Sequence, residues 1–310
     1  MAECDQDIQK GSSTELTQLV KERQVNISLG RIYDITAMPD GNFAVVYARP
    51  RRVSCAVVDG TTLITMSENE IVNSPYESDL ECKSATTVSL CSNGVMVASV
   101  RRGSFRSQHG TKRSEITELV KSRHAINGRI LLTASSCSVK EYEFDVACAK
   151  SDELFIMFLT TTPPQLEIED LSTGLSEHVQ LASFNTQFLS IFDRPHMSLD
   201  NSDGQTFVFI SAMVGFGNRV VTKLNLKGDI LATLVDPSAS IPGPIAAVGD
   251  GTQLFNYGDN ICLLSDKCKI VATLGSVGSN LRSMCFKRTS KGLRLYCLGD
   301  LNILTEYSCA

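Results

Sequence analysis

Several residue types and patterns are scarce or missing in this 310-residue sequence, and each absence excludes a class of protein. Tryptophan is absent, which removes the residue that stacks most strongly on bases and sugars. No run approaches the roughly 18 apolar residues of a membrane span, so we expect no membrane insertion. The N-terminus, MAECDQDIQKGSS, has neither a basic start nor an apolar core, which argues against a secretory signal. The four histidines are scattered, without metal-ligand spacing.

Charge and cysteine content further limit the class of protein and its cellular compartment. A formal charge of −5 and a pI of about 5.5 disfavour a globally basic nucleic-acid binder, although a local basic patch stays compatible with them. The 11 cysteines are odd in number and form no Cys-x-x-Cys pair. Several lie in apolar runs, namely Cys55, Cys91, Cys262, Cys285 and Cys297. This pattern is typical of buried free thiols in a reducing compartment, so we expect a cytoplasmic or nuclear protein, the cytoplasm first.

One pattern recurs along the chain: a strand-like run, a turn rich in Gly, Asp, Asn or Ser, and a second strand-like run. The six copies lie at 35–48, 87–100, 144–159, 196–212, 245–258 and 283–299, with turn positions Gly41, Gly94, Asp152, Gly204, Gly251 and Gly292. The turns are about 40 to 60 residues apart, which is the period of four-stranded propeller blades. A second hairpin follows in four units, at 52–66, 164–181, 218–235 and 260–275.

These units predict an all-β fold, a six-bladed β-propeller of four-stranded antiparallel blades, with seven blades or a two-domain β protein as alternatives. The last unit lacks a fourth strand, and we expect the N-terminal segment 16–29 to complete it and close the ring. Residues 1–13 are predicted to be a flexible tail and residues 14–310 a single propeller domain. A helical alternative remains for segments 15–25 and 115–126, whose Leu and Val residues also have helical spacing.

The fourth unit, 204–235, carries the clearest family signature. Its Asn218-Arg219-Val220 and Lys227-Gly228-Asp229 stretches resemble an NHL repeat, and the first unit fits the same frame at 39–42 and 59–60. The chain is therefore similar to the C-terminal NHL propeller of tripartite-motif proteins. This resemblance implies a platform that binds RNA or protein through the loops on one face. The ubiquitin-ligase activity of such proteins resides in a RING domain, and this sequence has no Cys/His pattern of that kind.

Two arginine-rich segments, 49–52 and 101–113, are the candidate binding site. They follow the second strands of neighbouring units, so a propeller would bring both to one face. Arginine offers planar donors that suit carboxylates and phosphates, and an aromatic ring can stack on a base. The candidate residues are Arg49, Arg51, Arg52, Arg101, Arg102, Phe105, Arg106, Lys112 and Arg113, with Asn218 and Arg219 from the NHL-like loop. A solvated surface insert is the alternative interpretation.

The neighbouring segment 67–82 is acidic and is expected to reach the same face, which favours a protein ligand over RNA. We therefore predict a non-catalytic interaction module that binds a protein partner, with RNA binding through segments 49–52 and 101–113 as the first alternative. A hydrolase or lactonase-type enzyme using the central channel ranks lower, because the inner strands offer little beyond Asp34 to hold a metal. No cofactor and no metal are expected, and the oligomeric state stays open.

Overall fold

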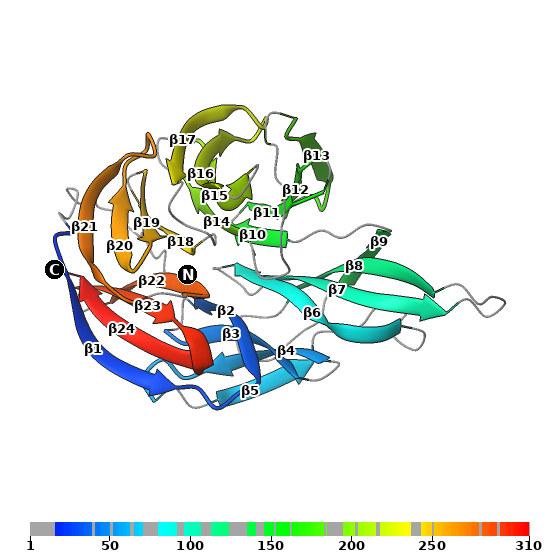
Figure 1. The fold of residues 1–310 in the computed structure, drawn as a ribbon, viewed down its shortest axis with the longest axis horizontal. Coiled ribbons are helices and arrows are strands. Elements are labelled where there is room, and N and C mark those ends of the chain that lie inside the picture. The colour runs from blue at the N-terminus through cyan, green and yellow to red at the C-terminus, as the bar shows by residue number, and fades with distance from the viewer. Residues whose placement is uncertain are drawn as a thin grey trace, which may run out of the picture.

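The computed structural model shows an all-β chain, with no α-helix among the residues it describes. Those residues are 16–38, 41–49, 52–62, 65–70, 80–91, 96–106, 113–123, 135–140, 146–151, 153–161, 163–182, 184, 195–201, 204–214, 218–236, 243–249, 251–278, 281–289 and 292–309. They form four-stranded antiparallel sheets around a ring (Figure 1). Segments 15–25 and 115–126 contain strands, so the helical alternative is wrong for their described residues.

Each sheet runs from an innermost strand near the ring axis to an outermost strand at the rim. In that order the sheets are β2 (Arg31–Ala37), β3 (Phe43–Arg49), β4 (Arg52–Val58), β5 (Thr65–Glu70); β6 (Leu80–Cys91), β7 (Met96–Arg106), β8 (Arg113–Arg123), β9 (Ser135–Lys140); β10 (Val146–Lys150), β11 (Leu154–Leu159), β12 (Gln165–Asp170), β13 (Ser176–Gln180); β14 (His196–Asp200), β15 (Phe207–Val214), β16 (Asn218–Asn225), β17 (Ile230–Asp236); β18 (Ile245–Gly249), β19 (Thr252–Tyr257), β20 (Asn260–Leu264), β21 (Ile270–Ser276); and β22 (Ser283–Thr289), β23 (Gly292–Leu298), β24 (Ile303–Cys309), β1 (Leu19–Asn26). Each innermost strand contacts the innermost strand of the next sheet, and β22 contacts β2.

The expected set of six similar blades, or seven, needs correction. Five sheets have the regular form of a propeller blade, with strands of five to eight residues. The sheet β6–β9 departs from this form, because β6 has 12 residues and β7 and β8 have 11 each. These strands carry the sheet outward beyond the other five (Figure 1), and no seventh sheet occurs among the described residues.

The N-terminal strand β1 is the outermost strand of the last sheet. It pairs antiparallel with β24, from Leu19 opposite Cys309 to Asn26 opposite Ile303. Leu19 is buried in the core between this sheet and β18–β21, together with Leu16. Ile27, just after β1, is buried in the core shared with β2–β5. Segment 16–27 is therefore part of two cores.

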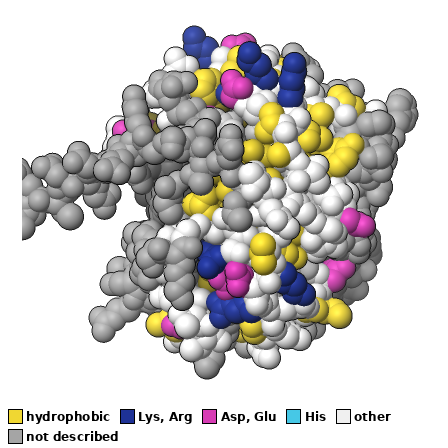
Figure 2. All heavy atoms as spheres, turned by 90° about the vertical axis from the view of Figure 1, so that its left-hand side faces the viewer, with side chains coloured by type: hydrophobic (Ala, Val, Ile, Leu, Met, Phe, Trp, Pro, Cys, Tyr) yellow, Lys and Arg dark blue, Asp and Glu magenta, His cyan; other side chains and the backbone are white. Residues whose placement is uncertain are grey.

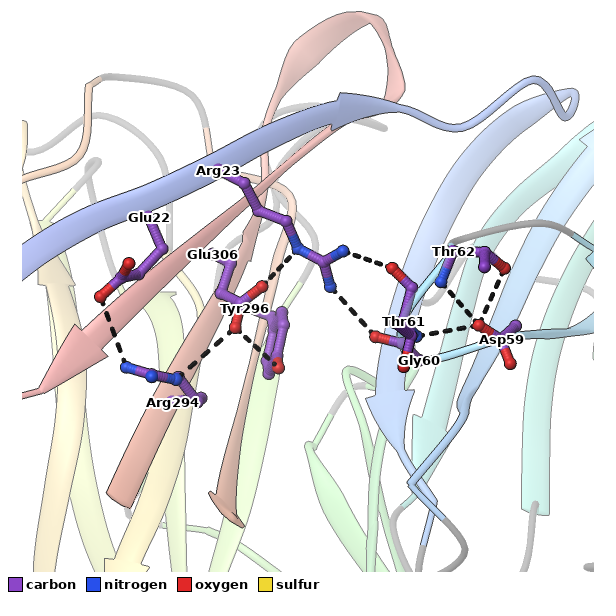
Figure 3. Close-up of polar contacts among 9 residues, drawn as sticks. All are labelled: Glu22, Arg23, Asp59, Gly60, Thr61, Thr62, Arg294, Tyr296 and Glu306. Atoms are coloured by element: carbon purple, nitrogen blue, oxygen red, sulfur yellow. Dashed lines mark hydrogen bonds and ion pairs between the residues drawn. The ribbon is translucent and has the colours of Figure 1, made fainter. Parts of the chain in front are cut away.

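A polar network ties β1 to the neighbouring sheet (Figure 3). Arg23 Nε donates to Glu306 Oε2 at 2.5 Å, and its Nη1 and Nη2 donate to the carbonyl oxygens of Thr61 and Gly60 at 2.5 and 3.0 Å. The Glu306 carboxylate also lies 3.6 Å from Arg294 Nε. Because Arg23 is about a third exposed, this network fixes position more than it adds stability.

The cysteines of the described core are free thiols, as the sequence predicted for Cys55, Cys262, Cys285 and Cys297. All four are buried among apolar side chains. Burial raises the pKa of Cys55 and of Cys285 to about 12. The reason is that an apolar interior disfavours the thiolate, so these side chains behave as small hydrophobic groups.

The raised thiol pKa values predict a loss of stability in alkali. Well below pH 9.0, the ordinary pKa of a thiol, both folded and unfolded chains keep Cys55 and Cys285 neutral. Above it the unfolded chain ionises first, so each thiol lowers the unfolding free energy by about 1.4 kcal/mol per pH unit until the folded pKa is reached. Urea unfolding at pH 8 and pH 10 measures this fall. It should be smaller in Cys55→Val by about 1.4 kcal/mol, and an identical fall in both chains would contradict the assignment.

Candidate functional site

The two ends of the ring differ in what they present. At one end each second strand turns into the third and each sheet connects to the next; we call this the loop end. At the other, the first strand turns into the second and the third into the fourth; we call this the turn end. The loop end holds the starts of β2, β4, β8 and β16, which include the candidate residues Arg52, Arg113, Asn218 and Arg219.

An exposed leucine stands at the loop end, in the short turn between β23 and β24. Leu301 is 77% exposed, and both Leu301 and Asn302 have φ of 59°, in the left-handed region. Asn302 secures the turn, because its Nδ2 donates to the Gly30 carbonyl at 2.8 Å and its Oδ1 accepts from the Ile32 amide at 3.0 Å. Asparagine adopts this conformation readily, whereas a leucine is strained in it by about 1–2 kcal/mol. The strain is retained in a turn that projects an apolar side chain into solvent.

Arginines flank this leucine. Arg282 Nη2 donates to Asp300 Oδ1 at 3.1 Å, and its Nη1 donates to the Ile32 carbonyl at 3.2 Å. Arg31, the exposed first residue of β2, lies with its guanidinium carbon 5.6 Å from the Tyr33 ring centroid. The chain therefore presents a leucine, a tyrosine and two arginines around the junction of β22 and β2. Arginine and tyrosine are enriched among the residues that contribute most to protein–protein binding, whereas leucine contributes there mainly as buried apolar surface.

The arginines of segment 49–52 belong to the same end of the same sheet. Arg31 is opposite Ala48 in the β2–β3 register, and Arg49 is opposite Arg52 across the β3–β4 hairpin. The next sheet follows directly, since β2, β3 and β4 all contact β6. Segments 49–52 and 101–113 are therefore in neighbouring sheets. Arg51 and Lys112 lie outside the described residues, and for Arg49 and Arg52 the backbone alone is described.

Segment 101–113 is not the single loop that the sequence suggested. Its first six residues, with Arg101, Arg102, Phe105 and Arg106, continue strand β7, and Arg113 begins β8. The register places Arg101 opposite Glu118 and Arg106 opposite Arg113. Pairing with β8 therefore continues through this arginine-rich stretch. These arginines are distributed along a projecting hairpin instead of lying in one loop.

The NHL-like pair separates in the structure. Asn218 is exposed at the start of β16, whereas Arg219 is 2% exposed between β14–β17 and β18–β21. The Arg219 guanidinium carbon lies 4.1 Å from the Phe255 ring centroid, and Nη2 donates to the Asn256 carbonyl oxygen. A Cβ atom on Gly243 would be 2.5 Å from that Nη2, so glycine makes room for it. A ligand at the loop end could contact the exposed Asn218. It could contact Arg219 only if the Arg219 side chain first left its buried position.

The inner strands hold one close polar pair. The Ser283 hydroxyl on β22 donates to Asp34 on β2, and the Asp34 carboxylate also accepts from the Ile35 amide at 3.0 Å. Both side chains are buried, so they join the two innermost strands. Within the described residues, no three His, Cys, Asp or Glu side chains form a group suited to a metal ion.

Sequence reasoning did not single out Arg31, Arg282 or Leu301. Arg31 and Arg282 each precede a predicted inner strand, and that position could have assigned them to the loop end. Nothing in the stretch Gly299-Asp300-Leu301-Asn302 signals a left-handed leucine, because leucine is uncommon there.

Comparison with known proteins defines the class of fold. No protein-family model matches the chain, and no curated protein matches its sequence. Among solved structures, the WD40 domain of Toxoplasma gondii coronin is similar, with a TM-score of 0.53 and 9% identity over 95% of this chain and 87% of that one. The chain thus has a β-propeller fold of the WD40 type, and at this identity the likeness concerns the fold alone. In the part of the chain that the structure describes, no helix is long and apolar enough to cross a membrane.

Proposed function

We propose that this propeller is a non-catalytic interaction module whose loop end binds a protein partner, with Leu301 as the apolar anchor. The observation that carries the proposal is the 77% exposure of Leu301 in a left-handed, hydrogen-bonded turn. Strained backbone persists where the surrounding structure enforces it, and such positions concentrate at binding sites. A partner that buries this side chain in a pocket would gain about 1.5–3 kcal/mol from it.

The charges around Leu301 indicate the chemistry of the partner. Arg31 lies beside the turn, Arg282 is paired there with the exposed Asp300, and Arg49 and Arg52 are at the same end of the adjoining sheet. Arginine forks pair bidentately with carboxylates, so the partner surface should combine an apolar pocket with Asp or Glu residues. The NHL-like character of Asn218 belongs to this proposal, because that exposed residue lies at the same end. A cytoplasmic setting fits the free thiols.

Site-specific cross-linking tests the proposal. A photo-reactive residue placed at position 301 of the full chain should capture a discrete partner in the native cell, and Leu301→Asp should weaken binding of that purified partner at least about tenfold. The matched control is Leu175, which is 73% exposed in the turn between β12 and β13, at the turn end. Leu175→Asp should bind the partner normally. Equal capture from positions 175 and 301, or equal affinity of Leu301→Asp and the parent chain, would refute the proposal.

RNA binding is the second candidate, supported by the arginines of the projecting β7–β8 hairpin. An RNA complex held by Arg101, Arg102 and Arg106 should weaken steeply with salt, and replacing the three should flatten that dependence. Filter binding of a random RNA pool over a salt series makes this measurement. Absence of binding at low salt would remove this candidate and leave the Leu301 proposal untouched.

A further inference from the structure

The outer rim of the ring contains one strand unlike the others. Each sheet ends in an outermost strand whose outer edge pairs with no described strand: β5, β9, β13, β17, β21 and β1. Five of these strands contain at least one charged residue; examples are Glu68 in β5 and Asp236 at the end of β17. The sequence of β21, IVATLGS, contains none. Charge on an edge strand normally hinders pairing with other chains; β21 lacks this protection along its whole length, and β17 has it only at its last residue, Asp236.

The large exposed side chains of β21 are apolar, and the smaller Thr273 and Ser276 are exposed beside them. Ile270 is 40% exposed and Val271 is 57% exposed, and a bulge in the β20–β21 register brings these consecutive residues to the surface together. Figure 2 views the molecule from the side of β21 and β1 and shows hydrophobic side chains gathered beside a group of charged ones. We call Ile270 and Val271 the β21 ridge. Two large aliphatic side chains next to each other at an edge resemble the apolar centre of a contact rather than scattered surface residues.

The two ends of β21 carry opposite charges. Lys267 and Lys269 are exposed in the turn just before the strand, together with one acidic residue, Asp266, so positive charge prevails at this end. At the far end, the exposed Asp259 is held against β21, because its carbonyl accepts from the Ser276 hydroxyl at 3.2 Å and from the Val277 amide at 2.8 Å. In an antiparallel arrangement of two identical strands, the start of each lies at the end of the other. The lysine end of each copy then lies beside the Asp259 end of the other. A two-fold axis repeats this contact, so opposite charges face each other at both ends of the paired strands.

We propose that β21 is the dimerisation edge of this protein and that its occupant is a second copy of the chain in antiparallel orientation. A two-fold axis near Thr273 places the β21 ridge of each copy against Gly275 and Ser276 of the other. Both residues are small and Ser276 is exposed, whereas the Cβ side of Gly275 faces Leu19 of the same chain. The same axis brings Lys269 beside Asp259 of the other copy. The dimer uses the outer rim, so it is independent of the Leu301 site at the loop end.

Sedimentation of the full chain tests this proposal, and a dimer in reversible equilibrium is expected. Val271→Lys should weaken dimerisation at least about tenfold. The matched control is Leu231→Lys on β17, where the replaced side chain is 50% exposed and follows an isoleucine at a corresponding bulge. That variant should dimerise like the parent chain. A parent chain that is monomeric at every attainable concentration, or a Leu231→Lys variant as defective as Val271→Lys, would overturn the proposal.

Charge reversal gives a test that does not depend on the ridge. Lys267→Glu with Lys269→Glu should weaken the dimer, since both changes bring negative charge to Asp259. Adding Asp259→Lys to that double variant should restore dimerisation, because the attraction is then re-formed with opposite signs. All of these positions are exposed, so folding should persist, and circular dichroism checks it. A triple variant that stays as weak as the double variant would show that the partner is not a second antiparallel copy.

Discussion

Deleting residues 1–27 is expected to leave a chain that does not fold. The deletion removes β1 and with it the buried side chains of Leu16, Leu19 and Ile27. Burial of each contributes about 1.5–3 kcal/mol, or about 5–9 kcal/mol together as an upper value. A domain has only about 5–15 kcal/mol of net stability, so this loss alone is comparable with the whole. The deletion also leaves the outer edge of β24 unpaired.

Circular dichroism during urea unfolding measures this effect. The deleted chain should show no cooperative transition, and addition of a synthetic peptide of residues 14–30 should restore one. The control is deletion of residues 1–13, the segment predicted to be a tail, which should leave the unfolding free energy unchanged. A cooperative transition of undiminished midpoint in the longer deletion would show that β1 is dispensable.

Gly60→Ala is expected to lower the unfolding free energy by about 3 kcal/mol or more. A Cβ atom at position 60 would lie 2.0 Å from the carbonyl oxygen of Gly41, and this neighbour is backbone that cannot rotate away. The turn around Gly60 is held in place, because its amide donates to Asn42 Oδ1 at 3.1 Å and its carbonyl accepts from Arg23. The Gly41 oxygen in turn accepts from Lys287 Nζ at 2.5 Å. Relief of the clash must therefore break contacts to two sheets. The free-energy cost should for this reason exceed that of ordinary overpacking.

A second glycine supplies the control for this substitution. At Gly299 a Cβ atom would meet only the Ile303 carbonyl oxygen, at 3.8 Å, and the backbone φ of −94° suits any residue. Gly299→Ala should change the unfolding free energy by less than about 0.5 kcal/mol. Urea unfolding of both variants makes the comparison. Equal stability of Gly60→Ala and Gly299→Ala would contradict the close approach of the two turns.

Much of the strand order could be predicted because turns need specific backbone conformations. Gly41, Gly204, Gly251 and Gly292, expected in the first turn of their units, all have positive φ, between 69° and 103°. A side chain is disfavoured there, so the glycines mark the hairpins in the sequence. The N-terminal strand could be expected from the incomplete last unit, and β1 lies beside β24.

The irregular sheet and the residues at the loop end could not be predicted in the same way. The polar composition of segment 101–106 indicated a loop, but pairing with β8 makes it strand. Strand propensity depends on the partner strand, which one sequence segment does not reveal. Arg219 shows a related limit, because its burial over Phe255 depends on how two sheets pack. An arginine side chain is typical of a surface loop, but Arg219 is buried because it contacts Asn256, which is 37 residues further along the chain.

The pairing of β1 with β24 also sets the order of events when the protein is made. Arg23 meets Glu306 across a sequence separation of 283 residues, so its partner is synthesised long after it. Until then β1 has no strand to join, and the apolar residues around it stay uncovered while the intervening sheets form. Contacts of such separation slow folding and lengthen the exposure of unpaired edges. The nascent chain therefore keeps this edge of β1 open until β24 has been made, and a chain that stops before Ile303 leaves β1 without its partner strand.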